Sequence, residues 1–502
     1  MNLKRMLERA VKRYGEKTAF AMGRRRLSYA RLDEDSNRVA NALTAMGVGK
    51  GDRVAMLLAN SPEFVTAYFG VVKVGGIAAL LDPKYKFTEL ASLLDDSQPR
   101  VLIAESPWLE PLIPALPRFK SVERVIDLSS KCGEQFLSYE EIMTRSASPA
   151  VEVKLEPEDI AHIAYSSGPA FHPRGVMMSH QALVREAAIS GDGFAQTDKD
   201  TVVLFALPMH HAFGLVVVML TAINKGSRVV ILSGISIDSL LRLIEREKAT
   251  IFMGVPFIHA LIVSAVESGE VKHDLSSLRL WGTAGAAMPA DTARRVKRYL
   301  GLTPVNFWGL TESAAHVTCT ALDSRGESGS VGRPLPGWEL RIVDDEGREL
   351  PTGQTGEIAV RGPVMRGYYH NPRATAQVMK NGWFYTGDVG WVDEDGRLFL
   401  SAGRKKDMII AKGQNICPSD IEEVLSAHPQ VAEAVVVGIA DKLRGEIPKA
   451  FVRLKPGAEI SEHEIKKFCL EHLANYKVPR EVVFADSLPK TADGKIGKEE
   501  LK

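Results

Sequence analysis

Residues 52–82, DRVAMLLANSPEFVTAYFGVVKVGGIAALLD, contain the pattern that decides the fold. An apolar run at 53–58 predicts a buried strand, 63–73 has helical spacing, and a second apolar run follows at 77–81. Two buried strands joined by a helix of this length predict a parallel pair with a crossover connection. The stretch therefore indicates an α/β protein.

The same alternation extends in both directions along the chain. Upstream, residues 28–48 predict a helix with Ser28 as its cap and Gly47 as its stop. Downstream, ELASLLDDS and RVLIAE repeat the helix and strand, and the alternation continues past Ser233 to LRLWGTAGAAM at 278–288. These repeats predict a large N-terminal α/β domain built on parallel sheets.

The pattern of expected secondary structure then changes twice along the chain. Residues 330–403 carry short strands with Gly-rich turns, which predict an antiparallel sheet or a distorted barrel within the large domain. After Gly403 a charged turn precedes about 100 residues with an α+β pattern, enough for a separate domain. We predict an N-terminal domain at 1–403, a hinge at 404–406 and a C-terminal domain at 407–502.

Composition limits the possible partners. The chain has 502 residues, with 63 Lys and Arg against 62 Asp and Glu, so no overall field attracts nucleic acid. Its four cysteines lie far apart, which fits a reducing cytoplasm better than a disulfide framework. The uncharged stretch 201–224 contains Pro208 and Gly214, so we expect a buried strand, loop and helix, with no membrane-spanning segment. A small-molecule partner is expected, and a homodimer is left open.

The segment YSSGPAFHPRGVMMSH, residues 165–180, resembles a loop that binds phosphate. A strand leads into a loop rich in Gly and Pro and then into a helix beginning near Ser179, so backbone N–H groups and Arg174 can surround phosphate oxygens. The Walker pattern is absent, which argues against a P-loop NTPase. An ordinary strand–helix turn remains the alternative.

Four further residues carry candidate nucleotide chemistry. In FWGLTES (307–313) the indole of Trp308 can stack on a purine, and Glu312 offers oxygen to Mg²⁺. In YTGD (385–388), Asp388 can accept hydrogen bonds from ribose hydroxyls, and Lys495 lies on an Asp-Gly turn. The structural alternatives are a core tryptophan, a turn-forming aspartate and a solvated lysine.

Taken together, these motifs resemble those of the adenylate-forming superfamily, which includes the acyl-CoA synthetases. The further matches are PMHHAFG (208–214), GTAGAAMP (282–289), GQTGE (353–357), GRKKDMIIAKGQNICPSDIE (403–422) and PKTADGKIGK (489–498). The resemblance covers nearly the whole chain. It implies a two-sheet domain with a barrel-like part and a small mobile C-terminal domain. It also implies that a carboxylic acid and ATP form an acyl-AMP and pyrophosphate, and that CoA then takes the acyl group.

The resemblance assigns roles by position. Lys495, His211, Thr311 and Glu312 would be catalytic, with Glu312 the Mg²⁺ ligand. The positions implied for ATP or AMP are Ser166, Ser167, Gly168, Arg174, Gly285, Ala286, Trp308, Gly309, Thr311, Asp388 and Arg404. Those implied for the acyl pocket are His210, His211, Gly214, Gly254 and Gly309.

The remaining positions concern domain motion. The resemblance places the hinge at Lys406 and the CoA-binding loop at Lys412 and Gly413. Rotation about a hinge at the end of an element can exchange one active-site lining for another. A surface lysine without a role is the alternative for Lys406.

The phosphate-binding loop departs from the family pattern. Pro169, Ala170 and Phe171 stand where the family has two threonines and a glycine, and Arg174 stands in place of lysine. Two hydroxyl donors and one N–H are lost. Besides an acid–CoA ligase, we therefore keep two alternatives: an acyl-AMP ligase that loads a carrier protein, and a catalytically impaired acyl- or adenylate-binding homologue.

The sequence gives one indication of the acid. Acetate-selective relatives carry a second tryptophan after the adenine-facing aromatic residue, and this chain has Gly309 there, which suggests room in the pocket. The run LVVVMLTAI after PMHHAFG would supply apolar walls. We expect an apolar acid larger than acetate: medium-chain, alicyclic or aromatic.

The role implied for Lys495 leads to a first prediction. The Lys495→Ala variant should lose acyl-AMP formation by about 10²-fold or more, because a charge that acts on the transition state is removed. Thioester formation from supplied acyl-AMP should stay near the wild-type rate, as measured in separate half-reaction assays. Equal losses in both half-reactions would show that this lysine is structural.

Overall fold

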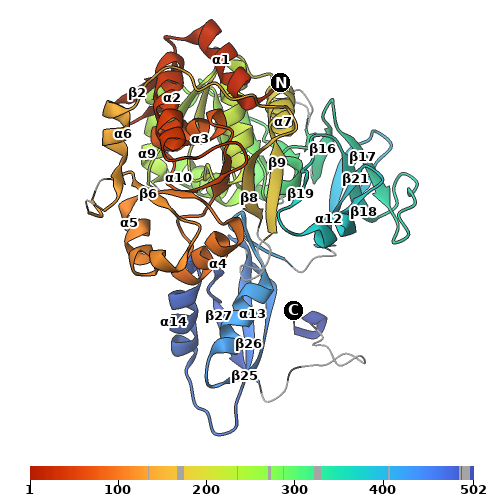
Figure 1. Cartoon of the computed structure of the whole chain (residues 1–502). Coiled ribbons are helices and arrows are strands. Elements are labelled where there is room, and N and C mark those ends of the chain that lie inside the picture. The colour runs from red at the N-terminus through yellow and green to blue at the C-terminus, as the bar shows by residue number, and fades with distance from the viewer. Residues whose placement is uncertain are drawn as a thin grey trace.

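The computed structural model describes residues 1–129, 131–133, 135–166, 174–234, 236–269, 273–286, 288–320, 329–404, 408–441, 443–485, 488 and 498–501. These residues form three sheets (Figure 1). Two large sheets and their helices make up the part of the chain up to Arg404, which we call the large unit. The third sheet and its helices make up residues 408–485, which we call the C-terminal unit.

The first sheet has eight strands, and the five pairings that run from β8 through β4, β3, β5 and β6 to β7 are parallel. In spatial order the strands are β19 (Gly367–Tyr368), β9 (Arg174–Ser179), β8 (Ile160–Ser166), β4 (Ile77–Leu80), β3 (Arg53–Leu57), β5 (Val101–Ala104), β6 (Arg124–Asp127) and β7 (Leu137–Ser138). The pairings of β8 with β9 and of β9 with β19 are antiparallel. The predicted strand–helix–strand unit at 52–82 thus lies at the centre of a mostly parallel sheet.

The second sheet has fourteen strands and two halves. The parallel half contains β1 (Thr18–Met22), β10 (Thr201–Leu204), β11 (Arg228–Ile231), β12 (Ile251–Gly254), β13 (Leu280–Thr283) and β14 (Val305–Trp308), with β2 (Arg25–Ser28) antiparallel at its edge. The antiparallel half contains β15 (Thr318–Cys319), β16 (Ser330–Pro334), β17 (Glu339–Val343), β18 (Gly356–Arg361), β20 (Met379–Lys380), β21 (Trp383–Val392) and β22 (Leu398–Arg404). Because β14 pairs with β15, the antiparallel strands expected at 330–403 continue the parallel sheet.

The helices of the large unit connect these strands. They are α1 (Leu3–Tyr14), α2 (Tyr29–Ala45), α3 (Pro62–Lys73), α4 (Phe87–Ser97), α5 (Ser106–Leu109), η1 (Glu110–Arg118), α6 (Tyr139–Arg145), α7 (His180–Gly193), η2 (Phe213–Leu220), α8 (Thr221–Lys225), α9 (Ile237–Glu247), α10 (Pro256–Glu267), α11 (Ala290–Leu300), η3 (Thr311–Ser313) and α12 (Pro372–Val378). A last turn, η5, covers Lys498–Leu501. The uncharged stretch 201–224 forms β10, a loop and the buried helical segment of η2 and α8, as expected. No helix among the described residues is long and apolar enough to cross a membrane.

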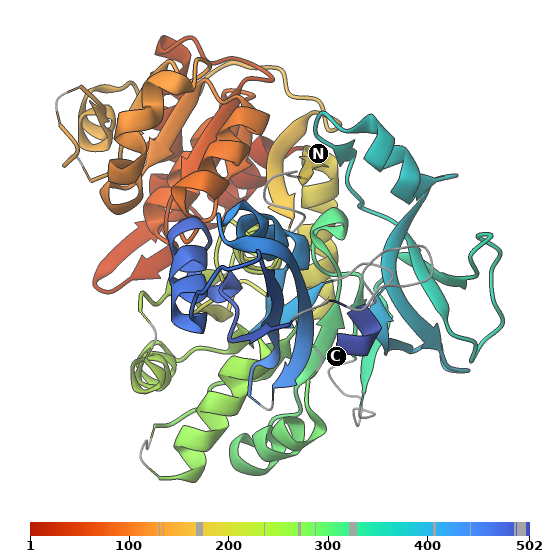
Figure 2. The same cartoon turned by 90° about the horizontal axis from the view of Figure 1, so that it is seen from below.

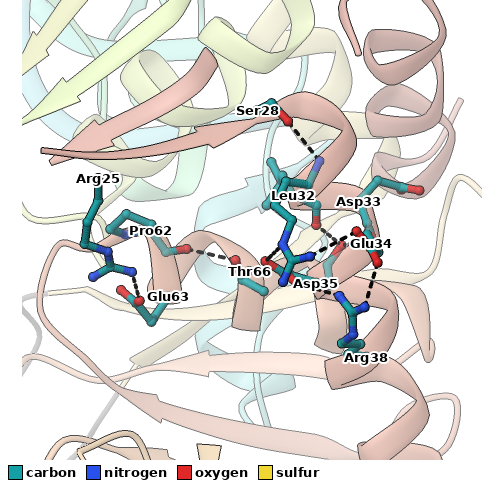
Figure 3. Close-up of polar contacts among 12 residues, drawn as sticks. Arg25, Ser28, Leu32, Asp33, Glu34, Asp35, Arg38, Pro62, Glu63 and Thr66 are labelled. Atoms are coloured by element: carbon teal, nitrogen blue, oxygen red, sulfur yellow. Dashed lines mark hydrogen bonds and ion pairs between the residues drawn. The ribbon is translucent and has the colours of Figure 1, made fainter. Parts of the chain in front are cut away.

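The start of α2 shows how local sequence sets an element. The Ser28 hydroxyl accepts a hydrogen bond from the N–H of Arg31 at 3.1 Å, so Ser28 is the predicted cap (Figure 3). Two turns later Arg38 forms ion pairs with Glu34 and Asp35 on the partly exposed face. The opposite face packs against α3, where Gly70 lies close to Val39.

The C-terminal unit has its own sheet and core. It contains β23 (Ile409–Ala411), β24 (Gln414–Ile416), α13 (Pro418–Ala427), β25 (Val431–Asp441), β26 (Gly445–Leu454), α14 (Glu462–His472), η4 (Asn475–Lys477) and β27 (Glu481–Phe484). A separate apolar core joins α13 and α14 to this sheet. Figure 1 shows the unit below the rest of the chain, with α14 beside α4, and Figure 2 shows it from below.

A buried polar network ties the antiparallel half of the second sheet to α7. The Trp338 indole N–H donates to Glu186 Oε2 at 2.9 Å, and the Ser190 hydroxyl donates to Glu186 Oε1 at 3.0 Å. Ser190 also lies 2.9 Å from His316 Nδ1. Burial raises the pKa of Glu186 well above its ordinary value, although both hydrogen bonds act in the opposite direction.

This network leads to a prediction about stability. Between the unfolded pKa of about 4.3 and the raised folded pKa, the folded chain holds one proton more than the unfolded chain, so the stability linked to Glu186 falls as pH rises. In Glu186→Gln a neutral amide keeps an acceptor for Trp338 and removes this dependence. In urea unfolding, the free energy of unfolding of the variant should therefore rise relative to that of the wild type by up to about 1.4 kcal/mol per pH unit between pH 5 and 7. A difference that does not change with pH would contradict a raised pKa for this carboxyl.

Candidate functional site

The predicted adenine and ribose residues meet at the end of β14. The Trp308 indole N–H donates to Asp388 Oδ2 at 3.0 Å, and both residues are buried. Asp388 lies within β21, where it pairs with Arg404 of β22 and its N–H donates to Thr386 Oγ1 at 3.1 Å. Asp388 is thus a strand residue and not a turn former, and Trp308 both belongs to the core and orients this carboxylate.

The predicted phosphate side is organised by Tyr368, a residue that was not predicted from the sequence. The Tyr368 hydroxyl donates to Glu312 Oε1 at 2.8 Å, and the Arg174 guanidinium lies over the Tyr368 ring, 5.8 Å from its centre. Burial, with the Glu312 carboxylate next in effect, raises the pKa of Tyr368 well above its ordinary value. Tyr368 therefore remains a hydrogen-bond donor at neutral pH and links Arg174 to Glu312. Thr311 begins η3 next to them.

The structure corrects one detail of the predicted phosphate-binding loop. Residues 174–179, expected to lie in a loop leading to a helix, form strand β9, which pairs antiparallel with β8. Ser166 and Arg174 are partners in this pairing, so the segment between them joins two adjacent strands. Ser167, Gly168, Pro169, Ala170 and Phe171 lie outside the described residues, as do Lys406 and Lys495.

Two histidines and a carboxylate lie together on the predicted acyl side. His210 Nε2 is 3.4 Å from Asp82 Oδ1, and the rings of His210 and His211 are 5.1 Å apart. Asp82 Oδ1 also accepts the N–H of Lys84 at 2.8 Å. Burial would raise the pKa of Asp82, but His210 and His211 outweigh it and hold that pKa below its ordinary value. Burial, with help from His210, lowers the pKa of His211 to about 4, so its imidazole is neutral at neutral pH.

The same three residues are the described group closest to metal-ligand geometry. One ligand atom from each of Asp82, His210 and His211 lies within 4.8 Å of the others. Both histidines were predicted from the sequence, but Asp82 was not, because a partner 128 positions away from His210 leaves no local pattern. The magnesium ligand predicted from the sequence, Glu312, belongs to the separate phosphate side.

At three glycines assigned to the acyl pocket, other protein atoms occupy the space that a side chain would need. A Cβ atom at Gly309 would lie 2.4 Å from the Ala315 backbone, and one at Gly214 would lie 2.3 Å from the Pro208 carbonyl oxygen. A Cβ atom at Gly254 would face His259 and Phe252. The expectation that Gly309 leaves room for the acid is therefore wrong, because the polypeptide backbone occupies the space beside its Cα. These glycines allow close backbone packing around the site.

The loop of Lys412 and Gly413 reaches the large unit. The Lys412 ammonium lies 4.8 Å from the centre of the Phe257 ring, and a Cβ atom at Gly413 would lie 2.6 Å from Val255. A Cβ atom at Gly285, whose φ of +83° favours glycine, would lie 3.7 Å from the Gly413 carbonyl oxygen. We call this the docked arrangement: the Lys412–Gly413 loop lies against Val255, Phe257 and Gly285, next to Ala286.

Comparison with known proteins gives the family. A model described as "AMP-binding enzyme" matches residues 7–369, and one described as "AMP-binding enzyme C-terminal domain" matches residues 420–495. The chain belongs to this family, the adenylate-forming acyl-CoA synthetases. The fold is that of these enzymes, with a large α/β domain of mixed sheets and a smaller C-terminal α+β domain.

Individual relatives agree over nearly the full length. A long-chain-fatty-acid–CoA ligase of Bacillus subtilis is 33% identical, over 98% of this chain and 93% of that protein. An indoleacetate–CoA ligase of Aromatoleum aromaticum is 34% identical, over 100% of this chain and 98% of that protein. A solved structure of an o-succinylbenzoate CoA synthetase double mutant from Bacillus subtilis, bound to its product analogue OSB-NCoA, is 29% identical. Its TM-score is 0.88, with 99% of this chain and 97% of that chain covered.

The position of Tyr368 leads to a prediction. In Tyr368→Phe, Glu312 loses a buried hydrogen bond worth about 1.5–3 kcal/mol for a charged acceptor, so pyrophosphate release on ATP addition should slow by roughly 10- to 100-fold. Thioester formation from supplied acyl-AMP should change little. The matched control is Tyr369→Phe, whose ring stacks on His370. Equal effects of the two substitutions would contradict a specific role for the Tyr368 hydroxyl.

Proposed function

We propose that this acyl-CoA synthetase activates a carboxylic acid with an apolar body larger than acetate, of medium-chain, alicyclic or aromatic type. The reaction is acid + ATP + CoA to acyl-CoA + AMP + pyrophosphate, through an acyl-adenylate. The support is the family membership together with relatives that act on acids with large apolar groups. One observation carries the proposal: the residues predicted to bind the nucleotide and those predicted to bind the acid lie along the same edge of the parallel strands.

In the first half-reaction, the described residues bind the nucleotide and the acid on opposite sides. Asp388, oriented by Trp308, would accept hydrogen bonds from the ribose hydroxyls, while Tyr368 holds Glu312 beside Arg174. The neutral imidazole of His211 would lie beside the acid's carboxylate. Attack of that carboxylate on the α-phosphate needs fixed positions and nearby positive charge, a role we assign to Lys495.

Magnesium fits the phosphate side. Carboxylate oxygen is a preferred ligand for Mg²⁺, and Glu312 is held in place by one of its two oxygens. When bound there with ATP, the ion would supply positive charge against the phosphate oxygens. Removal of Mg²⁺ with a chelator should then stop adenylate formation.

In the second half-reaction, we propose that the docked arrangement receives CoA. The Lys412–Gly413 loop borders Gly285 and Val255. Burial lowers the pKa of Lys412, and the nearby positive charges of Arg444 and Arg480 lower it further. Three neighbouring cations suit the phosphates of CoA. We place the hinge that reaches this arrangement at 404–406, with Lys406 as its pivot.

The apolar body of the acid would meet aromatic and aliphatic side chains near these strand ends. Phe213 packs edge-to-face on Phe307 with ring centres 5.0 Å apart, and Val255 and Leu310 are partly exposed beside the core. Such walls favour acids with more carbon than acetate, since each buried methylene contributes about 0.8 kcal/mol.

A panel of acids tests this proposal and separates its alternatives. AMP release should require CoA for full turnover, and kcat/KM for hexanoate should exceed that for acetate by roughly 200-fold, as expected for four more buried methylenes. Benzoate, indoleacetate and decanoate complete the panel. A preference for acetate would contradict the apolar pocket.

Two other outcomes identify the alternatives that the sequence left open. Transfer to a holo-carrier protein but not to CoA would indicate a carrier-loading acyl-AMP ligase. No pyrophosphate release with any acid, while adenylate binding persists, would indicate an impaired homologue whose altered loop at 169–174 no longer holds the phosphates.

A further inference from the structure

A buried cluster of charges joins the C-terminal unit to the large unit, far from the nucleotide residues. The Lys477 ammonium lies 2.6 Å from Glu89 Oε1 and 2.8 Å from Asp420 Oδ2. The side chains of all three residues are at most 4% exposed. We call Glu89, Asp420 and Lys477 the interdomain triad.

The members of the triad come from different units. Lys477 and Asp420 belong to the C-terminal unit, at the end of η4 and in the first turn of α13. Glu89 belongs to the large unit, in the first turn of α4. If the C-terminal unit rotates, the Lys477–Asp420 pair can move as one piece, whereas both contacts of Glu89 with that unit must break.

Glu89 uses both of its oxygens. Oε2 accepts the N–H of Ala474 at 2.9 Å and the N–H of Lys86 at 3.0 Å, so it caps α4 while it binds the C-terminal unit. Tyr85, in the turn before α4, places its ring 4.7 Å from the Lys477 ammonium. Burial opposes the charge on Lys477, but Tyr85, Glu89 and Asp420 outweigh it and raise the pKa of Lys477. The lysine is therefore charged, with Asp420 as its partner within the C-terminal unit and Glu89 as its partner across to the large unit.

The cluster and the CoA-side loop are formed in the same arrangement. While Glu89 holds Lys477 and Ala474, the Lys412–Gly413 loop lies against Val255 and Gly285. Two contact regions at separate places on the C-terminal unit restrict its orientation more than either contact would alone. A buried ion pair that loses one partner leaves an uncompensated charge, which makes this contact specific to the docked arrangement.

We propose that Glu89 is a positioning residue for the CoA step: it fixes the C-terminal unit in the docked arrangement through Lys477 and Ala474, and has no part in adenylate formation. This role rests on the proposed function, since it assigns the docked arrangement to thioester formation. Glu89 acts through the position of the Lys412–Gly413 loop and does not touch the substrates.

Separate half-reactions test the role. In Glu89→Gln, thioester formation from supplied acyl-AMP and CoA should fall by about 10- to 100-fold, while pyrophosphate release in the first half-reaction stays within about twofold of the wild type. Glu89→Asp keeps the charge on a shorter side chain and should recover part of the lost rate. Glu105→Gln is the matched control, since Glu105 also accepts a hydrogen bond from a backbone N–H of the large unit, that of Ala59.

Two results would overturn the role. Wild-type thioester formation in Glu89→Gln would show that the contact does not position the unit. Equal slowing of both half-reactions, without recovery in Glu89→Asp, would show a purely structural residue.

A second readout does not depend on activity. Hydrogen exchange of the Ala474 amide should speed up in Glu89→Gln and not in Glu105→Gln, and unchanged exchange would overturn the interdomain contact. If the wild type adenylates no acid, the proposed function fails, while the exchange result still decides whether Glu89 holds the C-terminal unit.

Discussion

The parallel pairing of neighbouring strands in the second sheet is the constraint on which the site depends. Strands β10, β12, β13 and β14 run side by side in the same direction, so their carboxyl ends lie along one edge. The chain leaving each strand supplies one part of the site: the histidine pair after β10, Val255 after β12, Gly285 after β13, and Thr311 with Glu312 after β14. Ligands of open α/β sheets bind at this edge.

Hydrogen bonding from the neighbouring elements then fixes the polar side chains at that edge. The antiparallel half supplies Asp388, which Trp308 orients, and Tyr368 of β19 orients Glu312 from the first sheet. Each of these two carboxylates is thus held by a donor from a different element, so the two sheets must pack together before the predicted site exists. The close approaches at Gly214 and Gly309 serve the same packing.

Much of the fold and part of the site could be predicted from the sequence, because their signals are local. The cap at Ser28, the strands around 53–58 and 77–81, and the helices of the C-terminal unit follow from short patterns. Strand β9 was missed because its six residues lie between a loop rich in Gly and Pro and a strong helix start. Gly309 was misjudged because the sequence shows a missing side chain but not the Ala315 backbone that fills its place.

Contacts between distant positions could not be predicted at all. Tyr368 and Glu312 are 56 positions apart, and Glu89 and Lys477 are 388 positions apart, so no local spacing records either pair. Only the packing of finished elements brings them together. The domain boundaries and the roles of Lys406 and Lys495 remain predictions from the sequence.

The most direct test of the site is a crystal structure of the protein with a non-hydrolysable acyl-adenylate analogue. The ribose should lie on Asp388, the phosphate mimic beside Glu312 and Arg174, and the acyl group beside His211 at the carboxyl ends of β12–β14. An analogue bound away from this edge, or with its acyl group pointing from His211 into solvent, would contradict the assignment.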